Sequence, residues 1–156
     1  MSERSDFKKI SLYEGPKQSP GFLLWHISTS WRSGIAEVLK PLGLTHPQFV
    51  VLAAIGWLTK NGDLATQSAI GKLAGLDPNT TSQILKGLEQ KALIERIQSK
   101  DARAKHPKLT PTGHSVLTKA LPAVEKQDAA FFSMLAKQEM QQLLQLFQQL
   151  VVGCET

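Results

Sequence analysis

The side chains best suited to chemistry in this 156-residue chain lie on one face of a helix expected over Pro78–Lys91. That outer face carries Asn79, Thr80, Ser82, Gln83, Lys86 and Gln90. Helical spacing turns a stripe of Thr81, Ile84, Leu85 and Leu88 the other way, toward a core. A helix face that meets only solvent usually carries Glu and Lys pairs, whereas five of these six side chains are uncharged. Uncharged donors and acceptors of this kind are the types that read the edges of DNA bases.

A basic segment follows this helix. Within Arg96–Lys108, five Lys or Arg residues face the single acid Asp101. We read a strand over residues 93–98, a turn over residues 100–106 and a short return strand over residues 107–110. Proline has no N–H for a strand ladder, so the return strand is expected to be short or at a sheet edge. A plain solvated hairpin is the alternative, but the charge bias favours a tip that binds an anion.

No pattern of catalytic residues is present. The four histidines, His26, His46, His106 and His114, lack the spacing of metal ligands, and the chain has no Gly-rich phosphate loop or paired carboxylates. The single cysteine, Cys154, excludes an internal disulfide and a cysteine-based metal cluster. It is either a redox-sensitive thiol or, as we prefer, an unreactive thiol near the chain end. We therefore predict no enzyme activity, no metal and no cofactor.

The composition is that of an ordinary globular protein, with 20% charged and 42% hydrophobic residues. The net charge of +5 favours a polyanionic partner without proving one. No apolar run approaches the roughly 18–20 residues of a membrane span, and no apolar segment follows the polar N-terminus as in a signal peptide. We expect a cytoplasmic protein that does not enter a membrane.

Helix-start signals organise the rest of the chain. Residues 1–19 are polar and are expected to form a loosely ordered arm, followed by a helix over residues 21–40. The next helix opens with a capping box of Thr45 and Gln48. The expected N-caps of the three later helices are Thr66, Asp77 and Thr110, and proline follows the last two.

Two long helices close the chain. The first is expected from Thr110 to about Leu135, with a bend at Pro122. The second carries one narrow apolar stripe, formed by Met140, Leu143, Leu144, Phe147, Leu150 and Val151. This stripe is too apolar to stay exposed. We predict that both ends of the chain interleave with those of a second copy in a two-fold hydrophobic interface.

The order and spacing of several short motifs resemble those of the MarR family of winged-helix regulators over roughly residues 20–150. The motifs are Leu44-Thr45-x-x-Gln48, Ile70-x-x-Leu73-Ala74, Leu88-Glu89-x-x-x-Leu93-Ile94-x-Arg96, Asp101-x-Arg103 and Leu109-Thr110-x-x-Gly113. The resemblance implies a mostly α fold with a small β-hairpin wing, in the order α-α-β-α-α-β-β-α-α. It also implies a homodimer that binds palindromic double-stranded DNA.

In this scheme residues 1–19 are an N-terminal arm and residues 45–110 are the winged helix-turn-helix domain. Residues 20–44 and 111–156 form the helical dimerisation region. Pro78–Lys91 becomes the recognition helix and residues 100–106 the wing. The residues expected to contact DNA are Asn79, Thr80, Ser82, Gln83, Lys86, Lys100, Asp101, Arg103 and Lys105.

The resemblance also assigns roles at the wing tip. Arg103 inserts into the minor groove and Asp101 braces it, and an Arg suits the negative potential of a narrow groove. A plain surface ion pair between these two residues is the alternative, although it leaves the surrounding lysines unexplained. The chain departs from the family at Ala92, where the family usually has glycine. If position 92 needs a left-handed backbone, alanine costs about 1 kcal/mol there.

Members of the family commonly bind small aromatic or phenolic effectors between the dimerisation helices and the DNA-binding domain. The aromatic residues on the two helices bordering that cleft are Trp25, His26, Trp31, Phe49 and Trp57. Ordinary core packing is the alternative for these residues. We expect a dimeric, sequence-specific transcriptional regulator, a repressor released by an effector. The alternative is a winged-helix adaptor for proteins that does not bind DNA.

Overall fold

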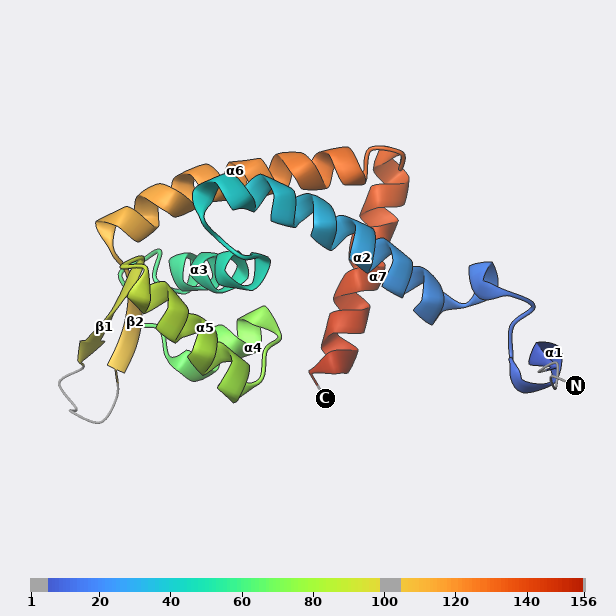
Figure 1. The fold of residues 1–156 in the computed structure, drawn as a ribbon, viewed down its shortest axis with the longest axis horizontal. Helices are drawn as coiled ribbons and strands as arrows, with labels where there is room; N and C mark the ends of the chain where they lie inside the picture. Colours follow the sequence, from blue (N-terminus) through green and yellow to red (C-terminus); the bar gives the residue numbers. More distant parts are fainter. Residues whose placement is uncertain (1–5, 99–104, 156) are drawn as a thin grey trace, which may run out of the picture.

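The computed structural model describes residues 6–98 and 105–155 and is mostly helical, as the sequence predicts. A small lobe hangs below a pair of long helices (Figure 1). The elements of the lobe are α3 (His46–Leu58), α4 (Gln67–Ala74), α5 (Pro78–Gln90), β1 (Ile94–Gln98) and β2 (Lys105–Leu109). Outside the lobe lie α1 (Phe7–Ile10), η1 (Pro16–Gln18), α2 (Pro20–Leu39), η2 (Lys40–Leu42), α6 (Pro111–Phe131) and α7 (Lys137–Cys154).

The predicted helix starts are confirmed. The Thr45 and Gln48 side chains each accept the other's backbone N–H at 3.2 Å, which completes the capping box of α3. Thr66 accepts from Ala69 N at 3.0 Å, and Asp77 accepts from Thr80 N at 2.8 Å. The Thr110 side chain caps α6 in the same way. Because each cap satisfies a backbone donor that the helix leaves unpaired, these residues fix where the helices begin.

The core of the lobe is formed by α3, α5 and the hairpin, and α2 and α6 cover it. Its fully buried side chains include Ile35, Leu39, Leu52, Ile55, Ile70, Leu85, Leu88 and Ile94. On α5, Thr81, Leu85 and Leu88 point inward as predicted. The recognition helix is therefore fixed through one face, and its other face remains outside the core.

The strand order departs from the expectation in one place. In the described residues the sheet has two antiparallel strands, with Ile94 opposite Leu109 and Gln98 opposite Lys105. Residues 63–66, where the family order places another strand, form no ladder. Instead, the ring Nδ1 of His106 lies 3.1 Å from the carbonyl oxygen of Ala65. The His106 side chain thus makes the contact with this segment that a strand ladder would have made. Pro107 has no backbone N–H, so β2 has one donor fewer for such a ladder.

Other boundaries also shift. β2 begins at Lys105, so Lys105 and His106 belong to a strand and not to the turn. Both strands are edges, which is how Pro107 is accommodated inside β2. α6 ends at Phe131 and runs through Pro122 as one continuous, gently curved helix (Figure 1). In the N-terminal arm, α1 and η1 are short helical turns that the sequence did not predict.

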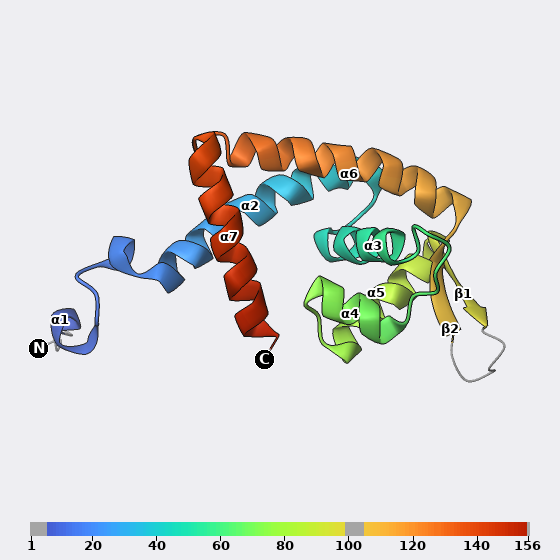
Figure 2. The ribbon, with the colours of Figure 1, turned by 180° about the vertical axis from the view of Figure 1, so that it is seen from behind.

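The long helices α2 and α6 lie side by side above the lobe (Figure 2). The Trp31 indole Nε1 on α2 donates a hydrogen bond of 2.8 Å to Asp128 Oδ1 on α6. Gly34 keeps the two helices close, because a Cβ there would lie 2.6 Å from Gln127 Nε2. Together the two helices form the platform on which the lobe is mounted.

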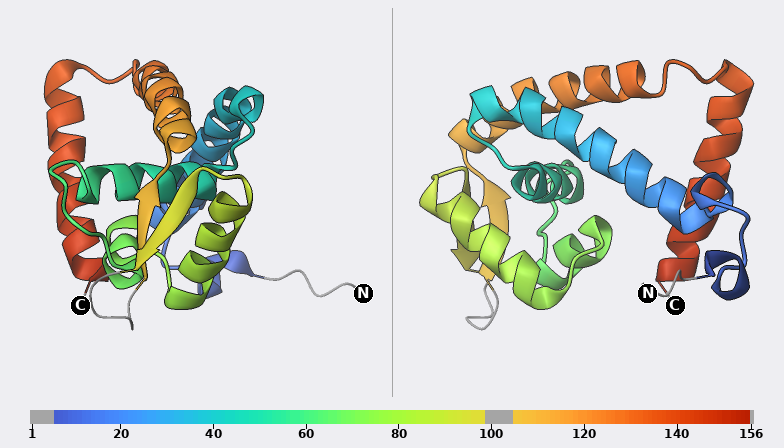
Figure 3. Two further views of the ribbon diagram at one scale, coloured as in Figure 1. Left: turned by 90° about the vertical axis from the view of Figure 1, so that its left-hand side faces the viewer. Right: turned by 45° about the vertical axis from the view of Figure 1, so that its right-hand side comes forward.

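The first half of α2 and the whole of α7 are poorly covered by the rest of the described chain. α7 has no buried residue and descends from the far end of α6, apart from the lobe (Figure 3). Large apolar side chains are exposed on the first half of α2 and on α7: Phe22, Leu23, Leu24, Trp25, Ile27, Leu144, Leu146, Phe147, Leu150, Val151 and Val152. Soluble monomers rarely expose so much contiguous apolar surface. A single chain therefore leaves these helices incompletely packed.

The turn after α5 carries backbone strain. Ala92 has φ of 58°, and among the described residues it alone has positive φ without being a glycine. The bonds from Ala92 N to Glu89 O and from Leu93 N to Leu88 O, at 2.9 and 3.0 Å, close the end of the helix around it. Position 92 therefore needs the left-handed conformation that glycine adopts at least cost.

Replacing Ala92 with Gly is expected to stabilise the protein by about 1 kcal/mol, because the left-handed backbone no longer opposes a Cβ. Thermal unfolding measures the effect as an increase in Tm. The matched control is Gly75→Ala at the end of α4, where φ is 68° and no atom lies within 4 Å of the added Cβ. Gly75→Ala should lose stability by an amount similar to that which Ala92→Gly gains. A lower Tm for Ala92→Gly would contradict the assignment of a left-handed backbone to position 92.

Candidate nucleic-acid interface

The outer face of α5 presents the predicted polar side chains to solvent. Asn79, Gln83 and Lys86 are exposed, and Ser82 is half-buried. None of these four makes a side-chain hydrogen bond within the described part of the chain. Their donors and acceptors therefore remain available for a ligand such as the edge of a base pair.

Thr80 is already engaged. Its hydroxyl donates to Asp77 Oδ2 at 2.6 Å, while its backbone N–H donates to Oδ1. These two bonds hold the pKa of the Asp77 carboxyl below its usual value. Behind them, Gly71 lets α4 approach α5, since a Cβ there would lie 2.8 Å from Thr81 Oγ1. Thr80 thus helps to fix the start of the recognition helix.

The base of the wing is described, but its tip is not. Lys105 is exposed at the start of β2, whereas Lys100, Asp101 and Arg103 lie outside the described residues. His106 is buried and contacts the loop before α4, so it supports the hairpin from inside. The strands β1 and β2 lie beside the C-terminal end of α5 (Figure 1).

The end of α5 is tied to the turn before α3, to α3 and to the start of α6, contacts that sequence reasoning missed. The Lys91 ammonium donates to Gly43 O, directly after η2, and to Gln48 Oε1 on α3 at 2.7 Å. The Thr110 hydroxyl, at the start of α6, donates to Ala92 O at 2.7 Å. These contacts join segments far apart in the sequence, so no local pattern could have indicated them.

The five aromatic residues expected around an effector do not form one cluster. Trp25 and His26 are exposed on the outer half of α2, and Phe49 is buried in the core. Trp31 and Trp57 line two different pockets. Helical spacing predicted which helices carry these residues. Because they lie at different positions along those helices, their side chains do not meet in one place.

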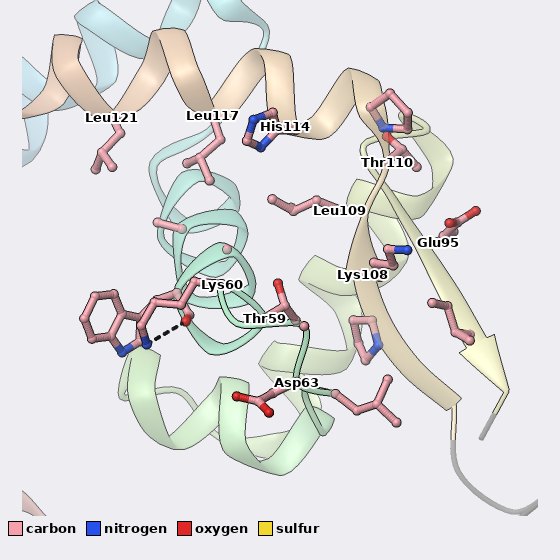
Figure 4. Close-up of a pocket in the computed structure, with 18 residues that line it drawn as sticks. Thr59, Lys60, Asp63, Glu95, Lys108, Leu109, Thr110, His114, Leu117 and Leu121 are labelled. Carbon is pink, nitrogen blue, oxygen red and sulfur yellow. Dashed lines mark hydrogen bonds between the residues drawn. The ribbon is translucent and has the colours of Figure 1, made fainter. Parts of the chain in front are cut away.

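The first pocket, here called the wing pocket, measures about 1030 Å³ and lies between the end of α3, the hairpin and α6 (Figure 4). Its apolar lining includes Trp57, Leu109, Leu117 and Leu121. The Lys60 ammonium lies 3.7 Å from the centre of the Trp57 ring and donates a hydrogen bond to the backbone oxygen of Trp57. Charges of both signs surround it: Lys60, Lys108, Asp63 and Glu95.

The second pocket, here called the α2–α3 pocket, measures about 930 Å³ and opens between α2, the start of α3 and the end of α4. Trp31 and His46 meet there edge to face, with ring centres 5.0 Å apart. Burial lowers the pKa of His46, and the positive charge of Arg32 lowers it further, while Asp128 acts in the opposite direction. Near neutral pH this imidazole is mostly uncharged.

Two other kinds of site are not found in the described residues. No group of three or more His, Cys, Asp or Glu side chains there is arranged to hold a metal ion. No single helix is long and apolar enough to cross a membrane, although Pro20–Leu42 and His46–Leu58, which meet at 76°, pass that test of length and composition as a pair.

A short helix, a second helix with an exposed polar face and a β-hairpin beside it define a winged helix-turn-helix protein of the DNA-binding kind. The model of the MarR family matches residues 42–104. The chain is 37% identical over 130 residues to the uncharacterised HTH-type transcriptional regulator YdcH of Bacillus subtilis, covering 83% of this chain and 88% of that protein. The chain belongs to the MarR family of transcriptional regulators.

Two solved structures show the same fold. CouR from Rhodococcus jostii RHA1, bound to p-coumaroyl-CoA, has a TM-score of 0.79 at 21% identity, covering 89% of this chain and 96% of that one. The MepR–DNA complex of S. aureus has a TM-score of 0.78 at 21% identity, covering 89% and 99%. The predicted family and fold class are thereby confirmed. The family consists of regulators, so this protein is not an enzyme, as predicted.

Proposed function

We propose that this protein is a homodimeric, sequence-specific repressor that binds palindromic double-stranded DNA and is released by a small-molecule effector. The observation that carries the proposal is the outer face of α5, where Asn79, Gln83 and Lys86 are exposed and unengaged. The rigid mounting of that face beside a basic hairpin supports the same function. The proposal places the protein in the cytoplasm, together with its DNA target.

The proposed contacts divide into two kinds. Asn79, Ser82 and Gln83 read base edges in the major groove, while Lys86 and Lys105 neutralise phosphates. For the wing tip we keep the expectation that Lys100 binds phosphate, Arg103 enters the minor groove and Asp101 braces it. Thr80 donates its hydroxyl proton to Asp77 in the free protein, so while that bond is kept its hydroxyl can contact DNA only as an acceptor.

We propose a domain division that the packing supports. Residues 45–110 form the DNA-binding domain, whereas residues 20–44 and 111–156 form the dimerisation region behind an arm of residues 1–19. The exposed apolar side chains of α2 and α7 support this division, because a second copy of the chain would cover them. The similar MepR structure is a DNA complex and the similar CouR structure holds p-coumaroyl-CoA, which supports control of DNA binding by a small ligand.

Two alanine variants test the proposal by affecting DNA binding in different ways. Lys105→Ala is expected to weaken binding to every duplex and to reduce the slope of log affinity against log salt by about 1. Gln83→Ala is expected to lose roughly 1–3 kcal/mol of discrimination at particular base pairs. Selection of duplexes from a random pool, followed by titration at several salt concentrations, measures both effects.

An unchanged preferred sequence in Gln83→Ala would show that the recognition face has been assigned wrongly. A wild-type protein that binds no duplex would favour the adaptor alternative.

A further inference from the structure

The described part of the N-terminal arm, residues 6–19, carries apolar side chains that the rest of the described chain leaves uncovered. No residue of this segment is buried, and neither α1 nor η1 buries a side chain. Its exposed large apolar side chains are Phe7, Ile10, Leu12 and Tyr13. Leu12 is 96% exposed. A solvated tail is poor in such side chains, so the pattern indicates a segment that packs against another surface.

The charge of the arm does not suit a nucleic acid. Residues 1–19 hold four basic and three acidic side chains, which nearly balance. The Lys9 ammonium is also paired with the Asp6 carboxylate at 2.9 Å. Arms that bind nucleic acids are strongly basic, because they neutralise phosphates. The apolar side chains therefore indicate the kind of partner, which is an apolar protein surface.

The position of the arm decides which copy of the chain it meets. The arm precedes the N-terminal end of α2 and the lobe follows its C-terminal end, and these 20 residues form a helix about 30 Å long. Between lobe and arm lie α7 and the first half of α2, with their exposed apolar side chains (Figure 1). A second copy that covers those side chains lies on the same side as the arm. The arm thus continues the two-fold interface onto the partner.

The wing pocket is an apolar surface of the lobe outside that interface. Trp57, Leu64 and Leu121 are exposed at the pocket, while Leu109 and Leu117 are half-buried in it (Figure 4). The pocket adjoins the hairpin, at the opposite end of the molecule from α1 (Figure 2). The arm placed to reach it is therefore that of a second copy.

We propose that residues 7–13 of each protomer pack into the wing pocket of the other, with their apolar side chains against Trp57, Leu64 and Leu121. Lys8 of the arm and Asp63 at the pocket have no ion-pair partner within the described residues, so they can pair across the contact. The proposal rests on the proposed function, because it requires the homodimer. Each arm then joins the platform of one protomer to the hairpin of the other.

A disulfide between two preparations of the full chain tests this contact. Both carry Cys154→Ser, which removes the exposed native thiol, and one carries Leu12→Cys while the other carries Leu64→Cys. After mixing, subunit exchange and oxidation, a covalent dimer is expected on a non-reducing gel, and neither preparation alone should form one. The matched control replaces Leu64→Cys with Leu73→Cys, a similarly exposed leucine on α4 outside the pocket, and should not cross-link.

A second measurement uses sedimentation of the dimer without any cysteine. Leu12→Asp is expected to weaken dimerisation by about 10-fold, because a carboxylate in an apolar pocket loses its hydration without gaining a partner. Gln18→Asp is the matched control, since it adds the same charge to an exposed position of the arm outside residues 7–13. We expect Gln18→Asp to leave the dimer unchanged.

Three results would overturn the inference while leaving the homodimer intact. The first is a wild-type dimer in which the Leu12→Cys and Leu64→Cys pair cross-links no more than the control pair. The second is a single chain with both cysteines that closes a disulfide within itself, which would place the arm on its own lobe. The third is equal weakening by Leu12→Asp and Gln18→Asp. A wild-type monomer would instead overturn the homodimer and the arm contact together, so the two failures are distinguishable.

Discussion

Replacing Leu143 and Phe147 together with Asp is expected to convert the dimer to monomers and to lower affinity for palindromic DNA by on the order of 100-fold. Both residues lie on the apolar stripe of α7, a helix with no buried side chain in the single chain. Buried carboxylates without partners strongly oppose association. Sedimentation at micromolar concentration and titration of one palindromic duplex measure the two effects.

The matched control places two aspartates on the opposite face of the same helix, at Gln145 and Gln149. They have the same spacing of four residues and are exposed, so Gln145→Asp with Gln149→Asp should leave the dimer intact. A wild-type protein that sediments as a stable monomer at micromolar concentration would contradict the assembly. An equal loss of dimer and of DNA affinity in both double variants would show that the added charge alone, and not its place on the apolar stripe, causes the loss.

Gly113→Ala is expected to destabilise the protein by about 3 kcal/mol or more, a large part of the stability of an ordinary domain. A Cβ at position 113 would lie 1.9 Å from Leu93 O and 2.8 Å from Leu93 C. The obstacle is backbone, and the bond from Thr110 N to Leu93 O holds that backbone in place. Neither side can move without breaking the junction between α6 and β1.

Urea unfolding measures this loss as a lower midpoint at unchanged slope. Gly21→Ala in α2 serves as control, because no atom lies within 4 Å of the added Cβ and alanine favours a helix. We expect Gly21→Ala to be neutral or slightly stabilising. Equal stability of Gly113→Ala and the wild type would mean that Gly113 does not lie as close to the Leu93 backbone as described here.

The sequence predicted best what short-range chemistry determines. A capping residue acts on backbone groups within three positions, so Thr45, Thr66, Asp77 and Thr110 could each be recognised locally. The outer face of α5 followed from helical period alone. Ala92 was singled out by comparison with the family's usual glycine, and the left-handed backbone stated there as a condition is the one that the structure has.

The sequence predicted poorly what depends on contacts between distant segments. The segment before α4 forms no strand and instead meets His106 through Ala65, two residues that are 41 positions apart in the sequence. The motif residue Leu73 is 52% exposed, whereas α4 buries Ile70 and Gly71.

The order of α2, the lobe and α6 in the chain has a consequence for synthesis on the ribosome. α2 emerges early, but α6, against which it packs most extensively, is complete only after Phe131 has been made. The lobe between them has apolar residues of its own and can begin to fold first. Until α6 emerges, the side of α2 that packs against α6 has no intramolecular partner, so it stays exposed during synthesis.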